Sequence, residues 1–175
     1  MKIIFAVLLT FGAFSLFACG RNNVGFSGDH SVMPEQKIEN FTITEMRGGK
    51  VIIVIESEGA VINDTSTKAF VRHPRVRFFQ DGVYTSTLVG EKAILNLENY
   101  NLRGVGKAVM NTVDGERLES YNLFYNAQTQ KVSSEYFVRL TRENETVTGV
   151  GFDADTALEN VNIRSPKIIL ENVSR

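Results

Sequence analysis

Few side chains in this sequence have the types and spacing that catalysis or metal binding requires. Asp153 and Asp155 alternate, so both carboxylates are expected on one side of a strand end, where we interpret them as a solvated turn pair. His30 and His73 are far apart, and neither has a Cys or second His at metal-ligand spacing. No Gly-x-Ser-x-Gly elbow marks a nucleophile, and no glycine-rich loop marks a phosphate site. The sequence therefore predicts a protein that is not an enzyme and that uses no metal or cofactor.

The chemistry that the sequence does support belongs to its only cysteine. Lys2 is followed by an apolar run over residues 3–17 and then by Ala18 and Cys19, an order that predicts a secretory signal peptide. An apolar residue shortly before a small residue and a cysteine resembles a bacterial lipobox, whose cysteine is diacylated and becomes the mature N-terminus. We therefore expect Cys19 to be lipidated. The alternatives are a signal cleaved elsewhere and an uncleaved anchor, which fits less well because a membrane span needs ~20 apolar residues.

This N-terminus divides the chain into three expected parts: a signal peptide over residues 1–18, a flexible tether over 19–36 and one folded domain over 37–175. The tether is polar and glycine-bearing and has no periodicity. With a single cysteine the domain has no internal disulfide, and its length is sufficient for a hydrophobic core. The formal net charge of −1 and the absence of a basic face exclude nucleic acid as a partner. We expect an exported, periplasmic protein that is anchored to a membrane by lipid.

The domain has the pattern of short β-strands joined by polar turns. Residues 51–55 are β-branched throughout and too few for a buried helix, so they predict a strand that is covered on both faces. Apolar positions then recur about every 30 residues. Two such columns are Leu88, Leu118 and Val147, and Leu102, Val132 and Val161. Each repeat is expected to hold two strands, the first of which ends near a turn at Asn96, Asn126 or Asp155.

Alternation of side chains predicts which faces are buried. Tyr121, Leu123 and Tyr125 are expected on one face of a strand, and Tyr136, Val138 and Leu140 on one face of another. One buried and one solvated face is typical of antiparallel sheets. The sequence therefore predicts an all-β protein in which stacked antiparallel hairpins form a two-sheet sandwich with free edge strands.

Four segments, in this order, resemble the LptC family of the lipopolysaccharide export system. They cover residues 56–70, 118–126, 131–134 and 147–155, and the resemblance extends over about residues 50–163. Among them are the segment Leu-Glu-Ser-Tyr-Asn-Leu-Phe-Tyr-Asn and the ending Gly-Val-Gly-Phe-Asp-Ala-Asp. The chain departs from the family at its anchor, because the usual member has an uncleaved transmembrane helix.

The resemblance implies an open β-jelly-roll that binds lipopolysaccharide through its lipid A acyl chains. It implies a carrier and connector that receives lipopolysaccharide from an inner-membrane ABC transporter of LptB/LptF/LptG type, at its N-terminal edge, and passes it to an LptA-like bridge protein. The expected lining residues are Phe79, Leu88, Leu95, Leu102, Val109, Leu118, Leu123, Tyr125, Val138, Leu140, Val147 and Phe152. The C-terminal edge around residues 147–163 would meet LptA, with Gly149 and Gly151 permitting a close backbone approach or an ordinary bulge.

Two alternatives stay open at this point. Each lining residue taken singly is better explained as packed core, although some of the set should face a groove if the resemblance holds; a core alone would make the protein a structural lipoprotein adaptor that uses its edges without holding lipid. Arg72, Arg75 and Arg77, with His73, form a small basic cluster that would contact headgroup phosphates or, as we expect, lie on a solvated strand face. The resemblance favours attachment to the inner membrane over the outer.

Overall fold

The computed structural model of the protein describes residues 35–63, 66–143 and 145–170. The expected signal peptide, the lipidation site at Cys19 and all of the expected tether except residues 35–36 lie outside the described part. The described residues belong to a unit that spans Met33–Arg175, and every secondary-structure element among them is a β-strand.

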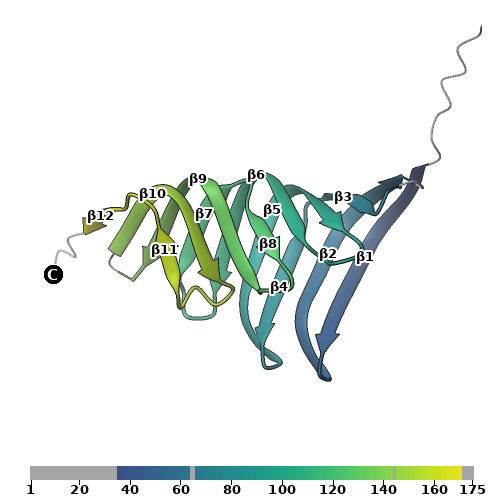
Figure 1. Ribbon diagram of the computed structural model, residues 1–175, viewed down its shortest axis with the longest axis horizontal. Coiled ribbons are helices and arrows are strands. Elements are labelled where there is room, and N and C mark those ends of the chain that lie inside the picture. Colours follow the sequence, from purple (N-terminus) through teal and green to yellow (C-terminus); the bar gives the residue numbers. More distant parts are fainter. Residues whose placement is uncertain (1–34, 64–65, 144, 171–175) are drawn as a thin grey trace, which may run out of the picture. The chain divides into compact units, whose positions relative to one another are not determined.

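The described residues form twelve strands in a single antiparallel sheet. The strands are β1 (Glu35–Arg47), β2 (Lys50–Asn63), β3 (Lys68–Arg72), β4 (Arg75–Gln80), β5 (Val83–Asn96), β6 (Leu102–Thr112), β7 (Arg117–Tyr121), β8 (Phe124–Asn126), β9 (Lys131–Arg142), β10 (Glu145–Asp155), β11 (Val161–Ile163) and β12 (Lys167–Leu170). Their order is β1-β2-β3-β5-β6-β7-β9-β10-β11, with β4 beside β2 and β5, β8 beside β6 and β9, and β12 beside β10. Figure 1 shows β1 at one end of this array and β11 and β12 at the other.

Every third strand of the array is split into two short pieces. β3 and β4 both pair with β2 and β5, β7 and β8 both pair with β6 and β9, and β11 and β12 both pair with β10. When each split pair is counted as one strand, the chain has the two-strand units that the sequence predicts. The first strand of successive units ends where expected, because β5 ends at Asn96, β8 at Asn126 and β10 at Asp155.

The splits lie where single residues adopt a left-handed backbone. His73 between β3 and β4, Asn122 between β7 and β8, and Ser165 between β11 and β12 have φ angles of 46°, 48° and 47°. Such angles are uncommon outside glycine and turn a strand out of line. Two of these residues hydrogen-bond to the neighbouring long strand. The His73 N–H donates to the Glu91 carbonyl of β5 at 2.9 Å, and the Asn122 N–H donates to the Gly106 carbonyl of β6 at 3.0 Å. The sheet bends along this line, which we call the crease.

The bend gives the sheet two walls that face each other across one core. The first wall contains β3, β8 and β11 and the second contains β4, β7 and β12, and β1, β2, β5, β6, β9 and β10 contribute to both. A row of paired, buried apolar residues crosses each wall. In the first wall the row is Ala69, Leu95, Leu102, Tyr125, Val132 and Ala154. In the second wall it is Ile55, Val76, Leu88, Met110, Leu118 and Leu140. The Phe78 ring of the second wall lies 5.0 Å from the Tyr125 ring of the first, so the walls meet.

The predicted fold class is therefore confirmed, with one refinement: the two sheets of the expected sandwich are one continuous sheet folded over at the crease. The strand expected at residues 51–55 is the start of β2, where Ile52, Ile53, Val54 and Ile55 are all buried. Within the described residues β1 pairs only with β2, and β11 and β12 pair only with β10. The expected free edges are thus β1 at one end and β11 with β12 at the other.

Two of the predicted face assignments are wrong, and in both cases the crease is the reason. Tyr121 is 50% exposed because the left-handed Asn122 interrupts the alternation before Leu123. Tyr136 is 52% exposed although Val138 is buried. Tyr136 lies in a bulge of β9, where Glu135 and Tyr136 together lie opposite the single residue Gly151 of β10, so its side chain leaves the inner face between the buried Ser134 and Val138.

Candidate functional site: the apolar interior and its mouth

On the side away from the crease, the two walls end in turns that form the rims of a mouth. The rim of the first wall, which we call the capped rim, consists of residues 97–101, 127–130 and 156–160. Each turn is capped by the residue that ends the strand before it. The acceptors are Asn96 Oδ1 for the Glu98 N–H at 2.9 Å, Asn126 Oδ1 for the Thr129 N–H at 3.0 Å, and Asp155 Oδ1 for the Glu159 N–H at 3.0 Å. The rim of the second wall, the hairpin rim, consists of the hairpins β1–β2, β4–β5, β6–β7 and β9–β10.

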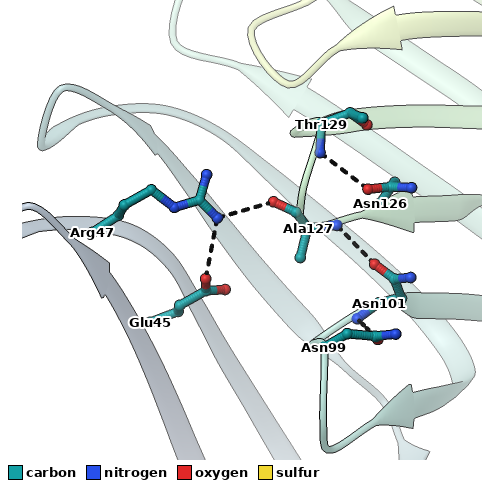
Figure 2. A network of polar contacts seen from close by, with 7 residues as sticks. All are labelled: Glu45, Arg47, Asn99, Asn101, Asn126, Ala127 and Thr129. Atoms are coloured by element: carbon teal, nitrogen blue, oxygen red, sulfur yellow. Dashed lines mark hydrogen bonds and ion pairs between the residues drawn. The ribbon is translucent and has the colours of Figure 1, made fainter.

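At the N-terminal end of the mouth, an arginine of β1 joins the two rims. Arg47 Nη2 donates to the carbonyl of Ala127 at 3.4 Å and lies 3.5 Å from Glu45 Oε1 (Figure 2). The Ala127 N–H donates in turn to Asn101 Oδ1 at 2.9 Å, so neighbouring turns of the capped rim are linked (Figure 2). Charged side chains thus border the interior at this end of the mouth.

Tyr125 reaches from the first wall towards this charged border. Burial raises the pKa of its hydroxyl well above the ordinary value, and the nearby Glu45 carboxylate raises it further, while Arg47 acts in the opposite direction. The phenol is 1% exposed and is therefore held in its neutral form beneath the Arg47–Glu45 pair.

At the C-terminal end of the mouth, two further hydrogen bonds join the rims. Ser86 Oγ of β5 donates to the carbonyl of Thr156 at 2.5 Å, and Arg142 Nη2 of β9 donates to the carbonyl of Leu158 at 2.5 Å. Arg142 Nε also lies 2.9 Å from Glu116 Oε1. In all three links a side chain of the second wall donates to a backbone carbonyl in a turn of the capped rim.

Ten of the twelve residues predicted to line the interior lie on its inner face, and two do not. Nine are buried in the core, where they pack together: Leu88, Leu95, Leu102, Leu118, Leu123, Tyr125, Val138, Leu140 and Phe152. Val147 lies on the same inner face, because it pairs with Leu140, but it is only half-buried. Phe79 and Val109 do not line the interior, since Phe79 follows the buried Phe78 and Val109 lies between the buried Ala108 and Met110.

The interior is filled by its own side chains in this conformation. An apolar cavity near the crease, bordered by Val76, Leu88 and Leu123, has a volume of about 10 Å³. That is no more than the space of one water molecule. A larger hollow of about 520 Å³ lies at the C-terminal end of the mouth, lined by both ends of β9 (Lys131 and Arg142) and by residues 153–155 and 159–162.

The two glycines that were expected at a partner edge lie one strand in from the edge. Gly149 and Gly151 belong to β10, which β11 and β12 cover. A Cβ on Gly149 would overlap Ile163 Cγ2 and lie 2.6 Å from the Arg164 carbonyl oxygen, and Gly151 has φ +78°. The close approach that the glycines permit is therefore made by the protein's own chain, next to the register shift between β9 and β10.

The corner between β11 and β12 is fastened to β9 by an ion pair. Arg164 Nη1 and Nη2 lie 2.7 and 2.8 Å from the two oxygens of Glu135. The hydrogen bond from Arg164 lowers the pKa of the Glu135 carboxyl, and the carboxylate raises the pKa of the guanidinium. Both side chains are exposed, so the pair positions the corner more than it stabilises the fold.

Other charged side chains that the sequence singled out form ion pairs or hydrogen bonds with nearby residues. Arg77 lies 2.8 Å from Glu56 and His73 lies 2.7 Å from Glu58, so carboxylates oppose the basic cluster. Asp153 accepts a hydrogen bond from Asn162 at 3.2 Å, and Asp155 caps its turn. No group of three His, Cys, Asp or Glu side chains suited to a metal ion occurs in the described part of the chain.

Sequence reasoning missed the residues that join the rims. The turns after Asn96, Asn126 and Asp155 were recognised, but not the side chains that reach across to them. Ser86 and Arg142 carry no sequence signal for this role, because their acceptors are backbone carbonyls. Leu158 was also missed, since a buried leucine in a polar turn follows no period.

Comparison of the sequence with known protein families identifies the family of this chain. The sequence pattern of the family described as lipopolysaccharide-assembly, LptC-related, matches residues 3–166. The chain is a member of the LptC-related family. A solved structure with a similar fold is that of LptH from Pseudomonas aeruginosa, described as the LptA-homologous periplasmic component of the lipopolysaccharide transport device. Its sequence is 17% identical, the alignment covers 68% of this chain and 94% of that chain, and the TM-score is 0.51.

No curated protein matches this LptC-related chain significantly. The likeness to LptH establishes the fold, and the family match establishes the family. Among the residues that the structure describes, none lie in a helix with the length and hydropathy to span a membrane.

Proposed function

We propose that this LptC-related protein is a periplasmic carrier and connector for lipopolysaccharide, which receives its cargo from an inner-membrane ABC transporter and passes it to an LptA-like protein. The observation that carries the proposal is the apolar interior: the row of the first wall runs from β3 to β10 and the row of the second wall from β2 to β9, and neither row contains a polar residue apart from the hydroxyl of Tyr125. Family membership supports the same cargo, since the family is defined by lipopolysaccharide assembly.

The physical need for such an interior follows from the cargo. Each methylene left in water costs ~0.8 kcal/mol, so a myristoyl-sized chain costs on the order of 10 kcal/mol. A folded sheet with a mouth along one side offers apolar walls to the chains, while the sugar and its phosphates stay in water at the rims. The charged side chains at the mouth, Arg47 and Arg142 among them, are suitable neighbours for such a headgroup.

The two free edges suit the connecting role. A strand with an unpaired edge accepts another strand through backbone hydrogen bonds. We assign β1 to the transporter of LptB/LptF/LptG type and β11 with β12 to the LptA-like protein. The partner edge is therefore moved outward from Gly149 and Gly151 to residues 161–170, although the two glycines still control it by letting β11 and β12 lie close.

The N-terminal segment would hold the protein at the membrane. The lipobox-like residues before Cys19 support lipidation at that cysteine, with attachment to the periplasmic face of the inner membrane, next to the transporter. Mass spectrometry of the mature N-terminus tests this assignment. A diacylated N-terminal cysteine is expected, and an intact Met1 or a different first residue would contradict it.

Photocrosslinking separates a carrier from a structural adaptor. A photoreactive residue at Val147, on the inner face, should form adducts with lipopolysaccharide in cells that produce the full chain. The matched control is Val109, a half-buried valine on the outer face. Equal adducts at both positions, or none at Val147 while the LptA-like partner is still captured, would favour an adaptor that holds no lipid. The filled interior is the observation on the adaptor's side.

A further inference from the structure

The turn over residues 156–160, which we call the plug loop, places a leucine in the interior with an unusual backbone. Leu158 has a φ angle of 61° and a fully buried side chain, and it belongs to the same apolar cluster as Phe78, Tyr125 and Phe152. The left-handed conformation is unfavourable for a leucine, so the loop stores strain while its side chain fills the core.

The plug loop is shaped by one residue and tethered by two others. Asp155 Oδ1 accepts the N–H groups of Ala157 and Glu159 at 3.1 and 3.0 Å, which fixes the form of the turn from within. The tethers to the second wall are the hydrogen bonds from Ser86 to the Thr156 carbonyl and from Arg142 to the Leu158 carbonyl. Because the cap lies within the loop, removing the two tethers breaks these hydrogen bonds to the second wall without removing the cap.

The position of the loop gives it a role at the mouth. Glu159 and Asn160 line the hollow of about 520 Å³ between the rims, and the Leu158 side chain lies buried in the apolar core. We propose that Leu158 occupies an acyl-chain subsite, and that a fatty acyl chain enters there when the plug loop leaves the second wall. This inference rests on the proposed function and adds the place of entry and the element that guards it.

Thiol labelling of the full-length protein tests the proposal. Leu158→Cys reports exposure of the plug, and Leu123→Cys, which is equally buried in a wall, is the control. The unsubstituted chain gives the background from Cys19. Added hexa-acylated lipid A should raise the maleimide labelling rate of Leu158→Cys about tenfold, without an effect at Leu123→Cys. The acyl-free sugar phosphate of lipid A should change neither rate. Thr156→Cys, in the same loop, replaces Leu158→Cys if circular dichroism shows that the latter does not fold.

A second comparison tests the tethers without lipid. Ser86→Ala, combined with the reporter, removes one tether and should raise the labelling rate about tenfold. Ser120→Ala is the matched control, because Ser120 is also buried and donates to a carbonyl, that of Phe137, but between neighbouring strands of one wall. Equal rates in Ser86→Ala and Ser120→Ala would overturn the tethered plug.

Co-elution of lipid A with the unsubstituted chain, measured in parallel, distinguishes the possible failures. Lipid A that binds while the labelling of Leu158→Cys stays unchanged would overturn the plug and leave the carrier function standing. Lipid A that does not bind at all would overturn the carrier function and the acyl-chain subsite together.

Discussion

Gly149→Ala tests whether a close backbone approach holds β11 and β12 against β10. The new Cβ would overlap Ile163 Cγ2 and would lie 2.6 Å from the carbonyl oxygen of Arg164. Because that oxygen belongs to the backbone, the overlap cannot be relieved by a side-chain rotation. The segment between β11 and β12 must therefore move away from β10.

The expected magnitude follows from two opposing effects. Overpacking in a well-packed site costs about 1–3 kcal/mol. Replacing a glycine by alanine also restricts the unfolded chain, which offsets about 0.4–1 kcal/mol of that cost. The free energy of unfolding should therefore fall by about 1–2 kcal/mol. The displacement should also loosen the edge that we assign to the LptA-like partner.

Urea denaturation followed by circular dichroism measures the change, and Gly90→Ala is the matched control. Gly90 lies in β5, and a Cβ there would have its nearest neighbours at 3.8 Å, in ordinary contact. Gly90→Ala should be as stable as the unsubstituted protein or slightly more stable. Hydrogen exchange should show lost protection in residues 161–170 of Gly149→Ala alone. Equal midpoints for the two variants, with residues 161–170 still protected, would refute the reasoning.

Three further predictions concern one core residue and two ionisable groups, one exposed and one buried. Phe152→Ala should lower the free energy of unfolding by about 3–5 kcal/mol, because the ring is fully buried. The control is Val150→Ala, because the Val150 side chain is 59% exposed. In the same denaturation assay it should change the free energy of unfolding by less than about 0.5 kcal/mol. Arg164 lowers the pKa of Glu135, so their ion pair contributes stability above the ordinary carboxyl pKa, and this stability is lost as pH falls through the lowered pKa. An NMR titration should find a higher Glu135 pKa in Arg164→Ala. An unchanged pKa would contradict the pairing. Burial raises the pKa of Tyr125, so above about pH 10 the folded state binds more protons than the unfolded state. The free energy of unfolding should therefore fall as pH rises beyond that point. In urea denaturation at about pH 9 to 11, the free energy of unfolding of Tyr125→Phe should fall less steeply.

The sequence by itself determined the strands, their buried faces and the turns that end them. The alternation in β9 and the β-branched start of β2 identify buried positions because successive side chains of a strand point to opposite faces. Asn96, Asn126 and Asp155 mark turns because their side chains cap the following N–H groups. The order of these local features also determined the family, which the match over residues 3–166 confirms.

Where the alternation failed, at Tyr121 and Tyr136, the backbone leaves the extended conformation at the crease. Neither side chain carries a signal for that change, because a left-handed Asn122 or a bulge of β9 opposite Gly151 depends on the bonds made by the neighbouring strand. The sequence likewise identified Gly149 and Gly151 as places of close approach or of a bulge. Only the tertiary structure decided that the approaching chain is the protein's own corner at Arg164.

The tertiary structure alone decided how the mouth is held. Arg47, Ser86 and Arg142 donate to the carbonyls of Ala127, Thr156 and Leu158, which are 80, 70 and 16 residues away. Every residue carries a carbonyl group, so an acceptor of this kind leaves no trace in the amino-acid sequence. Which carbonyl accepts the hydrogen bond depends on which turn the bent sheet brings next to the opposite wall. That position depends on how all of the intervening strands bend and twist together.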